Sequence, residues 1–290
     1  MKGIKKLFVN VLAVLMLVFS AFTMTACGAD VVTLEVTLQV YNFAEARYYE
    51  DDEVTLTIEM QRHLAEKTVD AITQYATDGH YDNAVFYLME GYTTQLMVGQ
   101  LKYDGDKVIK NDIMPQIEGE FEYGTTKGSN LVNDEGYVGL WRSWYAQDDG
   151  AHKFKSSNGM DSGRSTLYFP LQERLASYDG YFCVFGTIDY TEKANDTGVN
   201  SVGAILTDNY TTYVIYYTGE YDVNKPDEDY GLTFHCITAD EYNALSQEEQ
   251  DEVFVAEGDQ YVEYNMYRVR IPNKTPDGKS SAMIKSIKVK

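Results

Sequence analysis

The chain has 290 residues, of which 45 are Asp or Glu and 24 are Lys or Arg, so its formal net charge is −21. A surface this acidic repels phosphate backbones, which argues against a nucleic-acid-binding protein. Hydrophobic residues make up 44% of the chain, enough for one large packed domain or two small ones, which argues against a disordered protein. The 25 tyrosines favour a mainly β fold, because aromatic side chains pack well on a pleated sheet.

The first 27 residues have the order of an export signal. Three lysines precede an apolar run over residues 7–22, and small residues lead to Cys27. A retained membrane anchor would share the apolar run, but the run is shorter than the about 20 residues that a spanning helix needs. The segment therefore predicts a lipoprotein signal peptide over 1–26. We expect Cys27 to carry the lipid and to anchor the mature protein outside the cytoplasm, at the bacterial cell membrane.

A tether over residues 27–32 leads into the folded part, which we expect to span 33–290. Apolar and polar residues alternate over 32–40 and again over 54–60, on either side of an acidic turn. A period of two predicts half-buried strands, and the turn between them predicts a hairpin.

Two segments have helical spacing. Residues 64–77 place apolar side chains on one stripe and end before Gly79, which predicts a helix with a glycine stop. Residues 238–254 begin with Thr238 three positions before Glu241, the order of a capping box, and predict a surface helix.

Most other segments read as strands separated by loops, and no fixed-period repeat is present. Two long stretches rich in Gly, Asn, Asp and Ser, 104–136 and 146–164, predict loops. The further predicted strands are 84–89, 95–98, 137–144, 165–169, 181–188, 203–206, 210–217, 232–237, 268–271 and 282–289.

Cysteine and histidine provide little chemistry. Besides Cys27 there are only Cys183 and Cys236, so at most one disulfide can form, and the apolar run around Cys183 favours a buried free thiol. The four histidines lack the spacing of a metal site. We therefore predict no metal and no cofactor.

Several short motifs occur in a fixed order along the chain. They are AEKTV at 65–69, GHYDNAVF at 79–86, GLW at 139–141, STLYF at 165–169 and DGYFCVFG at 179–186. In this order the motifs resemble those of the cyclophilin family of peptidyl-prolyl cis-trans isomerases. The resemblance covers about residues 33–189 and 282–289, and it makes the segment of about 195–270 a C-terminal insertion.

The resemblance implies a closed eight-stranded β-barrel with capping helices. The outer face of such a barrel binds an Xaa-Pro peptide and speeds rotation about a bond whose barrier is about 18–20 kcal/mol. An apolar pocket holds the proline ring, and an arginine stabilises the twisted amide. The implied partners are exported proteins or peptides that contain Xaa-Pro, together with the membrane through the lipid on Cys27.

The sequence departs from the family at the arginine, because Leu88 occupies that position. Loss of one such donor typically costs about 2.7–4 kcal/mol of transition-state stabilisation. Arg142 or Arg164 could replace it. The register of the segment that holds Gln95 and Met97 stays open. The candidate groove residues are Phe86, Leu88, Tyr92, Gln95, Met97, Trp144, Thr166, Tyr168, Tyr178 and Phe182.

Three functions follow as hypotheses. The first is a cyclophilin-like lipoprotein that binds proline-containing segments with weakened or lost catalysis. The second is an active peptidyl-prolyl isomerase that assists folding at the membrane surface. The third is a ligand-binding lipoprotein of a transporter, which requires two lobes of alternating strands and helices.

Overall fold

The computed structural model describes residues 30–50, 54–90, 92–142, 160–171, 175–188, 208–218, 233–251 and 266–290. Its sixteen named strands are β1 (Val31–Asn42), β2 (Arg47–Tyr48), β3 (Thr55–Gln61), β4 (Tyr87–Met89), β5 (Tyr92–Val98), β6 (Leu101–Tyr103), β7 (Val108–Lys110), β8 (Glu120–Phe121), β9 (Thr126–Ser129), β10 (Tyr137–Leu140), β11 (Leu167–Pro170), β12 (Cys183–Ile188), β13 (Tyr210–Thr218), β14 (Thr233–Thr238), β15 (Tyr267–Pro272) and β16 (Ala282–Val289). The helices are α2 (Glu66–Thr77), α4 (Ala239–Asn243) and α5 (Gln247–Asp251).

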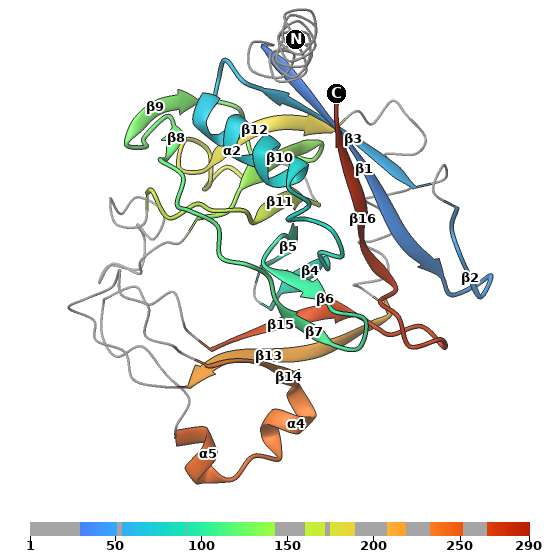
Figure 1. Ribbon diagram of the computed structural model, residues 1–290. Coiled ribbons are helices and arrows are strands. Elements are labelled where there is room, and N and C mark those ends of the chain that lie inside the picture. Colours follow the sequence, from blue (N-terminus) through green and yellow to red (C-terminus); the bar gives the residue numbers. More distant parts are fainter. Residues whose placement is uncertain are drawn as a thin grey trace, which may run out of the picture.

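One large sheet dominates the fold (Figure 1). Its twelve strands follow the order β14-β13-β15-β4-β5-β11-β10-β12-β3-β1-β16, and β2 pairs with β1. Every pair in it is antiparallel. The prediction of a mainly β fold is confirmed.

The first strands show why this sequence folds as a sheet. In β1 every second side chain from Val32 to Val40 is buried, and the residues between them are partly exposed. Strand β3 has the same pattern and pairs with β1, with Leu34 opposite Ile58. The two predicted strands therefore pair as a hairpin with one face in the core.

Helix α2 packs one apolar stripe against the sheet. Val69 and Ile72 are fully buried, and Gly79 follows the helix with a φ of 75°, a left-handed conformation that favours glycine. The helix begins at Glu66, two residues later than predicted. Its N-cap residue, Ala65, has no side-chain oxygen, and the buried carboxylate of Glu120 instead accepts the first backbone N–H groups.

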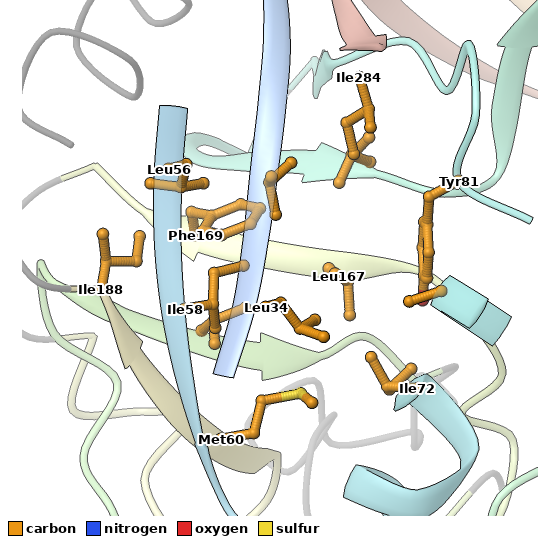
Figure 2. Close-up of a cluster of buried hydrophobic side chains, with 14 of the residues drawn as sticks. Leu34, Leu56, Ile58, Met60, Ile72, Tyr81, Leu167, Phe169, Ile188 and Ile284 are labelled. Atoms are coloured by element: carbon orange, nitrogen blue, oxygen red, sulfur yellow. The ribbon is translucent and has the colours of Figure 1, made fainter. Parts of the chain in front are cut away.

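Two hydrophobic clusters lie on opposite faces of the strands β4, β5 and β11. We call them the interior cluster and the outer cluster. The interior cluster contains Leu88, Leu96 and Phe169 together with α2 and the core faces of β1 and β3, and Figure 2 shows its side chains pointing toward one another. The outer cluster takes the alternate residues, including Met97 and Tyr168, and adds side chains from β13 and β15.

The large sheet contains eight consecutive strands that agree in number with the predicted barrel. Their order is β4, β5, β11, β10, β12, β3, β1 and β16. No strand ladder joins β4 to β16. A single bridge links Val85 to Met283, and the backbone N–H of Asn83 donates to the carbonyl oxygen of Ile284 over 2.9 Å. Closure of the barrel stays a prediction.

Strands β13, β14 and β15 fall within the predicted insertion of about 195–270 or at its end. Strand β15 pairs with β4, so these strands extend the large sheet beyond the eight strands. The single helix predicted over 238–254 is wrong, because the segment up to 251 forms two short helices, α4 and α5. The capping box at Thr238 is confirmed, and Ser246 and Glu249 make equivalent contacts before α5.

The predicted loop 104–136 contains the short strands β7, β8 and β9, which sequence patterning missed because each has at most four residues. None of the helices in the described residues has the length and hydropathy of a membrane-spanning helix. The predicted signal peptide, Cys27 and strand 203–206 lie outside the described residues.

Candidate peptide-binding site

The structure divides the predicted groove residues between the two faces of the sheet. Phe86 and Leu88 belong to the interior cluster, and each side chain is 2% exposed. The outer cluster brings together Met97, Tyr168, Tyr178 and Phe182. Thr166 is half-buried, and its carbonyl oxygen accepts the backbone N–H of Trp141. The side chain of Tyr92 and all of Trp144 lie outside the described residues.

Four rings form what we call the aromatic cluster: Trp141, Tyr168, Tyr178 and Phe182. Phe182 stacks on Tyr178 with ring centroids 4.7 Å apart, and it lies 5.3 Å from Trp141 and 5.8 Å from Tyr168. Three of the rings are at most 5% exposed, whereas Trp141 is half-buried. Such contacts stabilise ring pairs by about 0.5–1.5 kcal/mol beyond the area that they bury. The pocket positions are therefore filled by packed side chains.

A buried polar network holds the aromatic cluster in place. The hydroxyl of Tyr168 donates to Oδ1 of Asn133, which is fully buried. Oδ1 of Asp179 accepts both the backbone N–H of Asn133 over 2.7 Å and its side-chain amide over 3.2 Å. Complete burial raises the pKa of Tyr168 well above its ordinary value, so its hydroxyl keeps its proton. The network joins strand β11 to the segment that carries Tyr178 and Phe182.

Arg142 brings a cation to the edge of the aromatic cluster. Its guanidinium carbon lies 5.2 Å from the ring centroids of both Phe121 and Phe182, and its Nε donates to the carbonyl oxygen of Tyr181 over 2.7 Å. The side chain is 3% exposed, and burial lowers its pKa to about 10. At neutral pH the group stays charged, and the ring faces stabilise that charge.

A second ring pair continues the aromatic cluster toward solvent. The centroids of Tyr123 and Tyr181 are 4.8 Å apart, and Tyr123 is 51% exposed. The backbone N–H of Tyr123 donates to Gly180, next to Tyr181. Trp141 and Tyr181 both pack against the outer cluster and are half-buried, and Tyr123 pairs with Tyr181; we call these three rings, Trp141, Tyr123 and Tyr181, the aromatic surface.

Gln95 is a buried polar residue on the same strand as Met97. Its side chain is 1% exposed, and neither its amide nitrogen nor its amide oxygen has a hydrogen-bond partner among the described residues. Because alternate residues of β5 share a face, Gln95 lies on the Met97 side of the sheet. An unmade hydrogen bond at such a buried group costs roughly 1–3 kcal/mol.

Arg164, the other predicted replacement for the missing arginine, lies elsewhere. Its Nη1 donates to the carbonyl oxygen of Met114 over 2.6 Å. The segment around Met114 packs against the interior cluster. We therefore do not place Arg164 in the site.

Sequence reasoning missed several residues of this site, among them Trp141 and Asn133. Trp141 contacts the aromatic cluster, whereas the sequence pattern indicated Trp144, which lies outside the described residues. Asn133 lies in a segment read as loop, and no local pattern marks it as buried. The available signal was Arg142, a charged residue that follows the apolar run 138–141.

The two described cysteines contribute no chemistry to the site. Both are free thiols, Cys183 buried and Cys236 half-buried, and burial raises the pKa of each to about 12. Within the described ranges, no three His, Cys, Asp or Glu side chains are grouped as a metal site would require.

Comparison with known proteins identifies cyclophilin-type structures at low similarity. No family model and no curated protein matches the chain. Among solved structures, the chain is similar to a Cryptosporidium parvum cyclophilin type peptidyl-prolyl cis-trans isomerase, with 15% identity and a TM-score of 0.36, over 57% of this chain and 82% of that one. The structure of that isomerase in the presence of the dipeptide Ala-Pro gives 14% identity and a TM-score of 0.35, over 56% and 82%.

Proposed function

We propose that the chain is a cyclophilin-like lipoprotein that binds Xaa-Pro segments of exported proteins on its aromatic surface and has weak or no isomerase activity. The single observation that carries this proposal is that the partly exposed rings of Trp141 and Tyr181 pack against the buried Met97, Tyr168, Tyr178 and Phe182 on one face of the sheet, with Leu88 on the other face.

The glycines of the cyclophilin-like motifs support the fold part of the proposal. A Cβ on Gly139 would lie 2.3 Å from the ring of Tyr168, and one on Gly186 would lie 2.8 Å from the carbonyl oxygen of Glu59. Both positions therefore exclude any side chain for steric reasons. The eight consecutive strands are consistent with the closed barrel that the motifs imply.

The chemistry of the aromatic surface supports the choice of ligand. Proline-rich segments already favour an extended conformation, and grooves lined by aromatic rings bind them with little loss of conformational entropy. Trp141 and Tyr181 are half-buried and Tyr123 is exposed, so their rings can contact a ligand. We propose that a prolyl ring packs against them.

The position of Leu88 supports weakened catalysis. Its side chain packs in the interior cluster, and its strand neighbour on β15 is Arg270. An aliphatic side chain cannot stabilise a twisted amide, and one missing donor lowers a rate by about a hundredfold to a thousandfold.

A binding titration tests the ligand. Trp141 and Trp144 are the only two tryptophans, so in a Trp144→Phe variant the fluorescence reports on Trp141 alone. An Ala-Pro peptide should change this fluorescence and a matched Ala-Ala peptide should not. Tyr123→Ala should weaken binding about twofold to tenfold, the value of one ring contact. Phe43→Ala, which removes an exposed ring elsewhere, is the control. Equal responses to both peptides would contradict the proposal.

The second candidate, an active isomerase, is favoured by one observation, the charged Arg142 beside Phe182. A proline-limited refolding assay separates it from the first. We expect the wild-type chain to leave the slow phase of the refolding protein almost unchanged. Strong acceleration that is lost in Arg142→Met and kept in Arg164→Met would favour the enzyme.

The transporter hypothesis receives no support from the described part of the chain, whose large sheet is antiparallel and has no alternating helices. The lipoprotein part of the proposal rests on the N-terminal sequence. Mass spectrometry of the protein from a membrane fraction should find two or more acyl chains on Cys27, and Cys27→Ser should release the protein from the membrane.

A further inference from the structure

The chain enters and leaves the described fold at the same end of the sheet. Strand β1 starts at Val31, opposite Gln61 at the end of β3. The backbone N–H of Lys290 donates to the carbonyl oxygen of Thr33, and that of Arg62 donates to Asp30. Figure 1 shows the start of β1 and the C-terminus together at one end, with α4 and α5 at the opposite end. We call these the near end and the far end.

We infer that the near end faces the lipid bilayer and that α4, α5 and the edge strand β14 point away from it. This inference rests on the proposed lipidation of Cys27. Only Gly28, Ala29 and Asp30 separate Cys27 from Val31. Four peptide links reach about 14 Å at full extension, because each residue spans at most about 3.6 Å.

The tether is short compared with the length of the sheet, so it limits which end of the sheet can lie near the membrane. Strand β1 has 12 residues and therefore spans about 40 Å, at about 3.4 Å per residue. A lipid on Cys27 holds the start of β1 within about 14 Å of the membrane surface. When the near end faces the membrane, the far end lies farther from the membrane surface than the about 14 Å that the tether spans.

Charge opposes the alternative in which the molecule lies with its far end on the membrane. The far-end segment 233–251 contains five acidic residues and no Lys or Arg. Anionic lipid headgroups repel such a segment over about one Debye length. At the near end, Arg62 forms ion pairs with Asp70 and Glu66, and Lys290 pairs with Glu35, so cations and acids are mixed there.

Energy transfer from the protein to the lipid headgroups tests the orientation. Lys288→Cys labels the near end and Glu248→Cys labels the far end, and both positions are exposed. The native Cys183 and Cys236 are buried or half-buried with pKa values of about 12, so they label slowly at neutral pH. The lipidated full-length protein is reconstituted into vesicles that carry an acceptor dye on their headgroups.

We expect transfer from position 288 to be at least about twofold more efficient than from position 248, because the two ends differ by tens of ångströms. Insertion of a flexible 20-residue linker before Val31, with a mean span of about 25 Å, should reduce the difference. Equal transfer with the native tether, or greater transfer from position 248, would overturn the orientation. Mass spectrometry of the same sample distinguishes that result from absent lipidation, which would overturn the inference together with the proposed anchor.

Discussion

Glu120 serves as the N-terminal cap of α2 from a distant part of the chain, and we expect its removal to destabilise the fold strongly. Its Oε1 accepts the backbone N–H of Lys67 over 3.0 Å, and its Oε2 accepts that of Thr68 over 2.7 Å. The residue is 4% exposed. Glu120→Ala leaves two donors of the helix without this partner, the buried N–H of Thr68 and the part-buried N–H of Lys67, while Ala65 at the N-cap offers no replacement.

The magnitude follows from these contacts. A hydrogen bond to a charged group contributes about 1.5–3 kcal/mol, and loss of an N-cap side chain typically costs about 0.5–2 kcal/mol. Because one carboxylate makes both bonds, we expect Glu120→Ala to lower the free energy of unfolding by about 2–4 kcal/mol. Glu120→Gln keeps one acceptor oxygen and should lose about half as much.

Urea unfolding at pH 7 measures the effect. With a slope near 3 kcal/mol per molar, the midpoint should fall by roughly 1 M in Glu120→Ala. Glu122→Ala is the matched control, because it removes the same charge from an exposed position two residues away. If both variants unfold within about 0.5 kcal/mol of each other, the capping role is refuted.

Three further predictions concern buried groups. Burial lowers the pKa of His80 below its ordinary value of about 6.5, so folding favours the neutral imidazole. The stability that this provides should be complete above about pH 6.5 and should be lost as the pH falls through the lower pKa of the folded state. When unfolding is followed against pH, the profile of a His80→Gln variant should be flatter over this range. Gly139→Ala should lower stability by about 1–3 kcal/mol through its clash with Tyr168, and this loss should shrink in the background of Tyr168→Ala in a double-mutant cycle. A thiol reagent at pH 7 should leave Cys183 and Cys236 unmodified in the native protein and should titrate both in urea without reductant.

Each of these predictions has a result that contradicts it. Equal pH profiles for wild type and His80→Gln would exclude the histidine as the source of the slope. Simple additivity in the cycle would show that residue 139 acts without Tyr168. Rapid native labelling would place a thiol at the surface, and the absence of titratable thiols in urea would reveal a disulfide.

Local patterns predicted the longer strands and the first helix well, but not the short strands. The alternation in 32–40 and 54–60 depends only on which side chains face the core, so it can be read from the sequence. The last strand, 282–289, matches its predicted bounds. The helix ending before Gly79 was also visible, because a glycine stop is a local signal.

Contacts between distant segments could not be predicted. Nothing in the run 268–271 indicates that β15 pairs with β4, whose residues lie far earlier in the chain, because strand pairing depends on packing of the whole chain. The same limit explains the site. Asn133 becomes a buried partner of Tyr168 only when its segment folds over the aromatic cluster, and the role of Trp141 follows only from its ring contacts there.

Exchange NMR on a short peptide that contains one Xaa-Pro bond, with and without the protein, tests most directly whether the chain binds such peptides without isomerising them. The peptide reports binding through its shifts and isomerisation through its cis/trans exchange rate in the same sample. We expect shifts of the prolyl resonances that weaken in Tyr123→Ala, with an exchange rate close to that of the free peptide. Unshifted prolyl resonances at high protein concentration, or exchange accelerated by orders of magnitude, would contradict this expectation.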